Sequence, residues 1–126
     1  MDKRREIRYS IIEYLDNTIS KEDCILEIEV NGKIIAKSID ISMSGIGFEI
    51  IDVEQEQIET IQNNDNFFIK IYFAKEVVII DAKKVWSAVM KENDKDVLKG
   101  GLSFSVISTE DRLKLLKYIE DIREKL

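Results

Sequence analysis

Six segments of the sequence are rich in apolar residues typical of strands, most of them with an apolar side chain at every second position, and turn-forming residues separate them. In residues 24–30, Leu26, Ile28 and Val30 share one side and lead into Asn31-Gly32, a dipeptide typical of tight hairpins. The other segments span residues 34–39, 45–51, 67–73, 76–89 and 101–106. Six short antiparallel strands favour a barrel, because closure removes the exposed edges of a sheet.

The longer segments carry further expectations. Residues 76–89 predict a long strand with a kink or bulge, and Leu102, Phe104 and Val106 in the last strand are expected to share the inner face. Residues 52–66 are polar and predict a long connection with a single helical turn. Residues 9–15 are ambiguous between a short helix and an edge strand.

The C-terminal segment, residues 109–126, predicts a helix. Ser108 or Thr109 can cap its first turn, where Glu110 and Asp111 complement the helix dipole. The apolar stripe expected to cover a mouth or flank of the barrel consists of Leu113, Leu116, Ile119 and Ile122, with Leu126 beyond. A dimer seam is the alternative interpretation of this stripe.

Length and composition are typical of one soluble globular domain. The 126 residues are 44% apolar and 35% charged, and they are enough to bury a core without a metal or a disulfide. The longest aliphatic run, residues 77–80, is far shorter than a membrane span. The N-terminus lacks the apolar segment of a secretory signal, so we expect a cytoplasmic protein without membrane insertion.

The chain has one cysteine and no histidine. This composition excludes an intrachain disulfide, Cys/His metal sites and histidine-assisted nucleophiles. Cys24 opens a predicted strand and is interpreted as a small buried apolar residue. An enzyme that uses only carboxylates remains an alternative, since the chain has 25 acidic residues, but most of these are expected to be solvated surface, and we expect neither an enzyme nor a metal protein.

Basic residues are concentrated near the N-terminus of an otherwise acidic chain. The net charge is −6, yet four of the 19 basic residues, Lys3, Arg4, Arg5 and Arg8, fall within six positions. An acidic protein with one basic arm suits a small anion better than a nucleic acid, whose phosphates require a broad basic surface. A solvated tail is the alternative interpretation of this arm.

A second polar cluster, Asp40-Ile41-Ser42-Met43-Ser44-Gly45, lies between two predicted strands. Aspartate and serine side chains bond to nearby backbone amides, and Gly45 can adopt a positive φ or allow a close approach to the backbone. Taken alone, the cluster predicts a well-formed turn.

Together, these two segments resemble the signatures of the PilZ domain family. Arg4 and Arg8 match the pattern Arg-x-x-x-Arg, and residues 40–45 match Asp/Asn-x-Ser-x-x-Gly. Softer matches are Val85-Trp86, Gly101-Leu102-Ser103-Phe104 and the helix start at Thr109. The resemblance covers nearly the whole chain and implies a mainly β fold. It implies a single PilZ domain over residues 1–126, with a basic arm at 1–20, a six-stranded antiparallel β-barrel at 24–106 and a C-terminal helix at 109–126.

The family's ligand is cyclic di-GMP, a bacterial second messenger with two guanines and two phosphodiesters. The resemblance implies that Arg4 and Arg8 bind guanine edges and phosphates, while Arg5 adds charge or is solvated. It also implies that Asp40, Ser42 and the backbone around Gly45 hold the other guanine. The resemblance implies no cofactor beyond this ligand, and a partner protein that receives the signal when the arm closes over the barrel.

Several alternatives remain open at this stage. Trp86 offers either a stacking face for a base or a core side chain. The gap between Arg8 and Asp40 is longer than the family pattern suggests, which favours a PilZ-like adaptor that binds only proteins. An unrelated barrel for single-stranded nucleic acid is disfavoured by the acidic charge.

Overall fold

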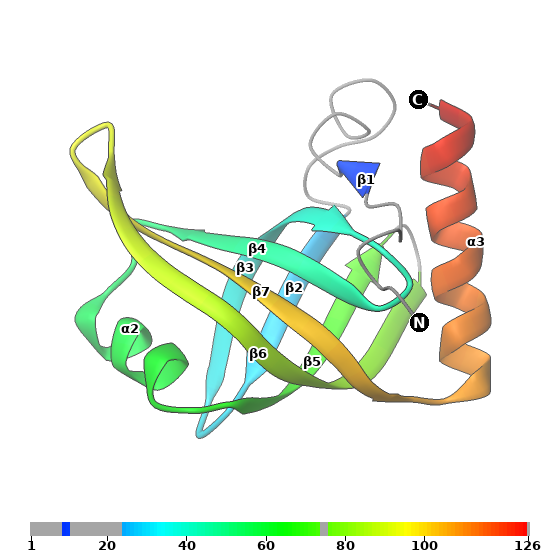
Figure 1. Cartoon of the computed structure of the whole chain (residues 1–126), viewed down its shortest axis with the longest axis horizontal. Coiled ribbons are helices and arrows are strands. Elements are labelled where there is room, and N and C mark those ends of the chain that lie inside the picture. Colours follow the sequence, from blue (N-terminus) through cyan, green and yellow to red (C-terminus); the bar gives the residue numbers. More distant parts are fainter. Residues whose placement is uncertain (1–8, 11–23, 74–75, 126) are drawn as a thin grey trace.

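A computed structural model describes residues 9–10, 24–73 and 76–125 of the chain. Its strands are antiparallel, and β2 to β7 close into a barrel in the order β3, β2, β5, β6, β7, β4, with β4 pairing back to β3 (Figure 1). The strands are β1 (Tyr9–Ser10), β2 (Cys24–Glu29), β3 (Lys33–Ile41), β4 (Gly45–Ile51), β5 (Asn66–Phe73), β6 (Glu76–Glu92) and β7 (Lys95–Ile107). The prediction of a six-stranded barrel is confirmed; β1 adds to it by pairing with the end of β3.

The core is made by the alternation visible in the sequence. In β2, Leu26 and Ile28 are fully buried, and in β5 the side chains of Phe67, Ile69, Ile71 and Phe73 are all at most 4% exposed. Asn31 and Gly32 form the turn between β2 and β3 with positive φ angles of 52° and 134°, as the dipeptide predicts. One face of each strand therefore fills the barrel, and the other faces outward.

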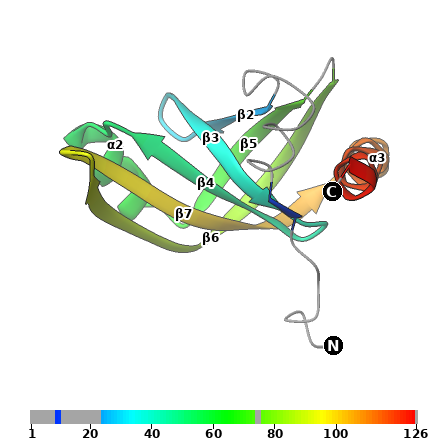
Figure 2. The ribbon, with the colours of Figure 1, turned by 90° about the horizontal axis from the view of Figure 1, so that it is seen from above.

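Two helices lie at opposite ends of the barrel, as Figures 1 and 2 show. Helix α2 (Gln55–Gln62) is longer than the single helical turn expected from the sequence. The backbone N–H of Glu54 donates to Oε1 of Gln57 at 3.0 Å, and Ile61 is fully buried, so the helix is held at both its start and its end. The length of this helix was not predicted because its sequence is mostly polar and it buries few apolar side chains in the core.

Helix α3 (Thr109–Lys125) packs on the barrel with a face that differs from the predicted one. The buried residues are Leu115, Tyr118, Ile119 and Ile122, whereas Leu113 and Leu116 are 61% and 39% exposed. The prediction that Leu113 and Leu116 face the barrel was therefore wrong, and the prediction for Ile119 and Ile122 is confirmed. The buried face includes an aromatic stack, in which the rings of Phe73 and Tyr118 lie 4.2 Å apart.

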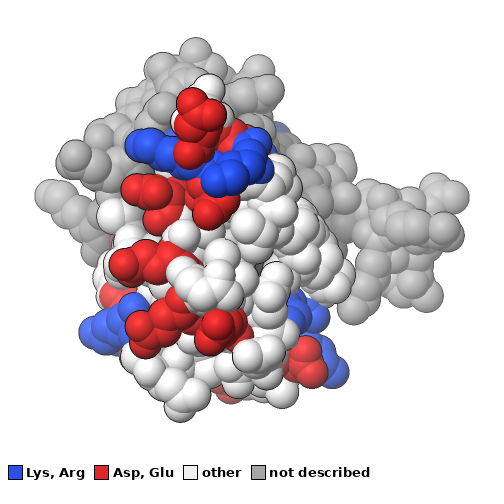
Figure 3. Space-filling view, turned by 90° about the vertical axis from the view of Figure 1, so that its left-hand side faces the viewer, with Lys and Arg blue, Asp and Glu red and all other residues white. Residues whose placement is uncertain are grey.

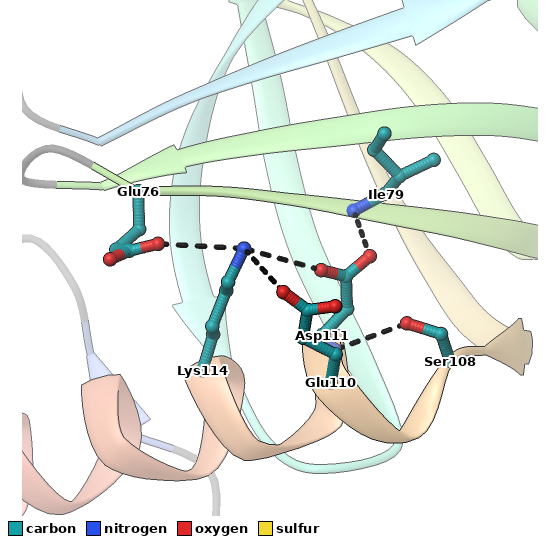
Figure 4. A network of polar contacts seen from close by, with 6 residues as sticks. All are labelled: Glu76, Ile79, Ser108, Glu110, Asp111 and Lys114. Carbon is teal, nitrogen blue, oxygen red and sulfur yellow. Dashed lines mark hydrogen bonds and ion pairs between the residues drawn. The ribbon is translucent and has the colours of Figure 1, made fainter.

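Polar contacts at the first turn explain this rotation of α3 (Figure 4). Ser108 caps the helix by accepting from the backbone N–H of Asp111 at 3.1 Å. Asp111 in turn accepts from the backbone N–H of Ile79 in β6 at 3.2 Å, and Lys114 lies 3.5 Å from Glu76. Because Asp111 is tied to the barrel, the residues one turn further along the same face are the ones that become buried.

Irregularities interrupt the pairing of three strands. The pairing of β6 with β7 shifts between Asp81 and Ala82, where Ser105 is the extra residue and donates its hydroxyl to the Asp81 carbonyl at 2.9 Å. Beyond this shift Val106 is 62% exposed, so the expectation that Val106 faces inward was wrong. The predicted bulge in β6 is confirmed between Lys84 and Trp86, and β3 has one between Ser38 and Asp40.

Candidate ligand-binding site

The predicted arginines Arg4, Arg5 and Arg8 lie outside the described residues. The described segment that follows them is β1, in which Tyr9 pairs with Ile41 and Ser10 pairs with Asp40. The chain thus passes directly beside Asp40 at Ser10, two residues after Arg8. This adjacency joins the start of the chain to the polar cluster more than thirty positions later.

Ser42 and Gly45 shape the turn between β3 and β4. The backbone N–H of Ser42 donates to the Gly45 carbonyl at 2.9 Å, and Ser42 Oγ accepts from the N–H of Ser44 at 3.3 Å. Ser42 is 1% exposed, and Gly45 does not use a positive φ, which among the described glycines occurs at Gly32. A direct ligand contact by either residue therefore stays a prediction.

Asp40 belongs to strand β3 and not to the turn, which begins after Ile41. The shift in pairing makes Ile39 the extra residue, since Ser38 pairs with Phe48 while Asp40 pairs with Gly47. Ser38 is fully buried, and regular alternation would turn Asp40 to the same inner side. The bulge instead directs Asp40 outward, where its Oδ1 accepts from the backbone N–H of Gly47 at 3.1 Å.

A second bulge, in strand β6, likewise directs Trp86 outward. Lys84 pairs with Leu102 and Trp86 pairs with Gly101, so Val85 is the extra residue. Trp86 is 48% exposed, which excludes the interpretation of its side chain as a core residue. Two bulges in two different strands therefore turn a carboxylate and an indole toward the same outer surface.

Asp40 and Trp86 are the two ends of a row of four residues that pair across neighbouring strands. Asp40 pairs with Gly47, Gly47 pairs with Gly101, and Gly101 pairs with Trp86, so the row crosses β3, β4, β7 and β6. The two central positions are glycines and carry no side chain. The row is a bare strip of backbone with Asp40 at one end and Trp86 at the other.

The glycines are required by close packing at both ends of this strip. A Cβ atom at Gly47 would lie 2.8 Å from Oδ1 of Asp40, and one at Gly101 would lie 2.5 Å from Nε1 of Trp86. Both distances are too short for any other residue unless the neighbouring side chain moves. Asp40 and Trp86 therefore lean over the glycine floor from opposite sides.

A cavity of about 260 Å³ lies over this strip. Its lining combines one carboxylate, one indole, aliphatic side chains and glycine backbone, and consists of Ile39, Asp40, Gly47, Val85, Trp86, Gly101 and Leu102. A flat floor with an aromatic wall and a fixed acceptor suits a planar ring that presents N–H donors at one edge. Sequence reasoning missed Gly47, although a second glycine inside a strand indicates a close approach to the backbone.

Among the described residues that line the cavity, Asp40 is the charged one, and a pair of opposite charges lies further along the same strands. Two positions along β4 and β7 from the Gly47–Gly101 pair, Lys99 pairs with Glu49, and its Nζ lies 2.8 Å from Oε2 of Glu92. The hydrogen bond that Lys99 donates to Glu92 raises the pKa of Lys99. The end of the molecule near α2, in contrast, shows mostly acidic side chains (Figure 3).

The described part of the chain contains no group of His, Cys, Asp or Glu side chains that could hold a metal ion. None of its helices is long and apolar enough to cross a membrane. The polar and aromatic groups that line the cavity are a carboxylate, an indole and glycine backbone.

No protein-family model and no curated protein matches the sequence. Solved structures do match. The PilZ domain of YcgR from Escherichia coli with c-di-GMP has a TM-score of 0.70 at 14% identity, covering 98% of this chain and 93% of that one. The inhibitor of motility MotI/DgrA of Bacillus subtilis has a TM-score of 0.65 at 18% identity, covering 100% of this chain and 54% of that one.

The PlzA protein of Borreliella burgdorferi, solved in complex with c-di-GMP, has a TM-score of 0.64 at 11% identity, covering 96% of this chain and 52% of that one. The present chain therefore spans about half the length of MotI/DgrA and PlzA. All three alignments cover nearly all of the present chain, including barrel and helices. The chain has the fold of a PilZ domain.

Proposed function

We propose that this protein is a cytoplasmic receptor for cyclic di-GMP and not an enzyme. The observation that carries the proposal is the row of Asp40, Gly47, Gly101 and Trp86, which forms a flat slot with a fixed acceptor at one end. Two of the similar structures, YcgR and PlzA, were solved with c-di-GMP, which supports the same ligand here.

Guanine matches the chemistry of the slot. Its ring N–H and amino group form a pair of donors on one edge, and the Asp40 carboxylate can accept from both. Its planar face can stack on the Trp86 indole, because the glycine floor leaves room beside the ring. The strip crosses three strand spacings, roughly 14 Å between the backbones at its ends, and a purine would enter the cavity of about 260 Å³ above it.

The arginines supply the remaining contacts in this proposal. Arg8 directly precedes β1 in the sequence, and Ser10 of β1 pairs with Asp40. Arg4 precedes Tyr9 by five positions, and an extended segment of that length reaches about 17 Å, enough to cross the strip. Arg4 and Arg8 would bind guanine edges and phosphates with their planar guanidinium groups, with Arg5 adding charge.

Calorimetric titration with cyclic di-GMP tests the proposal, with GTP as the control ligand. We expect saturable binding that the Arg4→Ala, Arg8→Ala double variant loses, since each arginine–guanine pair contributes roughly 1–3 kcal/mol. The matched control is the Arg112→Ala, Arg123→Ala variant, which removes two exposed arginines from α3 and should bind normally. A folded wild-type protein that gives no heat would contradict the receptor function and leave the protein-binding adaptor.

We further propose that the ligand orders the N-terminal arm over the barrel and so creates a surface for a partner protein. The pairing of Ser10 with Asp40 supports this, because a ligand held by Asp40 would contact the arm next to its anchor. Amide hydrogen exchange should show added protection over residues 2–20 when cyclic di-GMP is present. Unchanged exchange there, in a sample that binds the ligand, would contradict the ordering step.

A further inference from the structure

Lys84 lies next to the bulge that turns Trp86 outward, and its side chain contacts a different element. Its Nζ donates to the carbonyl oxygens of Ile61 at 3.0 Å and Gln62 at 2.9 Å, the last residues of α2. Its backbone N–H donates to the carbonyl of Asp65 at 2.8 Å, and the Asp65 carboxylate lies 3.9 Å from Nζ. The Lys84 side chain is only 15% exposed.

These contacts are strong because of where they are made. The last carbonyl groups of a helix have no partner within the helix, and they form the negative end of its dipole. An ammonium group that donates to two of these carbonyls gives them hydrogen-bond partners and also places a positive charge at the negative end of the dipole. Strand β6 is therefore fastened to the end of α2 at Lys84.

The bulge begins at the next residue. Regular alternation would place Trp86 on the same side of β6 as Lys84, which faces α2. The extra residue Val85 changes this, and both Val85 and Trp86 line the outer cavity. The direction of the indole thus depends on the position of the bulge in β6. The hydrogen bonds of Lys84 to α2 hold the bulge at this position.

We propose that Lys84 is a positioning residue for the ligand site, because it holds the bulge that keeps the Trp86 indole over Gly101. Lys84 itself touches no ligand in this scheme. The expected effect of Lys84 on ligand affinity rests on the proposed function, whereas its expected effect on the orientation of Trp86 does not. Trp86 is the only tryptophan of the chain, so its fluorescence reports the indole alone.

The test uses the full chain with Lys84→Met, which keeps an apolar stem of similar length and removes the ammonium donor. Without ligand, we expect lower fluorescence anisotropy of Trp86 and stronger quenching by acrylamide than in the wild type. Affinity for cyclic di-GMP should fall by roughly two- to thirtyfold, the range for residues that act on a site without contacting the ligand. Lys83→Met is the charge-matched control, since Lys83 is exposed and neighbours the same bulge.

Lys84→Arg should restore both readouts, because a guanidinium can donate to the same two carbonyls. If Lys84→Met does not fold, as judged by circular dichroism, Lys84→Gln takes its place with the same expected changes. Unchanged Trp86 fluorescence in a folded variant would overturn the positioning role. Altered fluorescence, together with a wild type that does not bind cyclic di-GMP, would support the positioning role and contradict only the receptor function.

Discussion

The backbone N–H of Gly47 donates a hydrogen bond to Oδ1 of Asp40 at 3.1 Å, across the pair of strands β3 and β4. The carboxylate lies so close above Gly47 that a Cβ atom there would be 2.8 Å from Oδ1. The strand next to Asp40 therefore both orients the carboxylate and leaves the space that it occupies. An acceptor held in this way is preorganised for a ligand donor.

Replacing Asp40 with asparagine removes the negative charge and keeps an oxygen that can accept from the N–H of Gly47. The amide oxygen can still accept from the Gly47 N–H, so the free energy of unfolding should change by less than about 0.5 kcal/mol. Affinity for cyclic di-GMP should fall by roughly tenfold to a hundredfold, because a hydrogen bond to a charged group contributes about 1.5–3 kcal/mol. Calorimetry measures the affinity and urea unfolding measures the stability. Wild-type affinity in this variant would show that the Asp40 carboxylate does not bind the ligand.

Gly100 and Gly101 are neighbours in β7, but alanine should weaken ligand binding at Gly101 and lower stability at Gly100. A Cβ at Gly101 meets the half-exposed Trp86, so Gly101→Ala should displace the indole and weaken ligand binding by roughly fivefold or more. A Cβ at Gly100 lies 2.7 Å from the fully buried Phe48 ring, so Gly100→Ala should lower the free energy of unfolding by about 1–3 kcal/mol.

Urea unfolding and ligand titration of both variants check this pair of expectations. Each variant serves as the control for the other, since the same methyl group is added one residue apart. Equal losses of affinity and equal losses of stability would contradict the assignment of Gly101 to the floor of the slot.

The strands could be predicted from the sequence because alternation of apolar residues reports burial on one face. Leu26, Ile28 and the inner residues of β5 follow that rule without interruption. Helix α3 could be predicted as a helix, yet its buried face could not. Leu113 and Leu115 are both leucines, and contacts with distant strands, such as that of Asp111 with Ile79, determine which of them faces the barrel.

The site could be predicted only in part. Residues 40–45 identified Asp40, but nothing in the sequence located the bulges at Ile39 and Val85, which depend on the pairing between distant strands. Without those bulges the outward direction of Asp40 and Trp86 cannot be derived. The glycine floor likewise becomes recognisable only when the register aligns Gly47 with Gly101.

The buried face of α3 can be tested with two leucines. Leu115 is fully buried, so Leu115→Ala should lower the free energy of unfolding by about 2–5 kcal/mol. Leu113 is 61% exposed, and Leu113→Ala should change it by less than about 0.5 kcal/mol. Urea unfolding monitored by circular dichroism distinguishes them. A larger loss at Leu113 would mean that the originally predicted stripe is the packed one.

The central claim is that a guanine of cyclic di-GMP lies in the slot between Asp40 and Trp86. The most direct measurement is a fluorescence titration of the wild-type protein, because Trp86 is its single tryptophan. Stacking of a base on the indole should quench the emission saturably with cyclic di-GMP, at the same midpoint that calorimetry gives, and GTP should leave it unchanged. Calorimetric binding with no change in Trp86 emission would contradict the claim and place the ligand elsewhere on the protein.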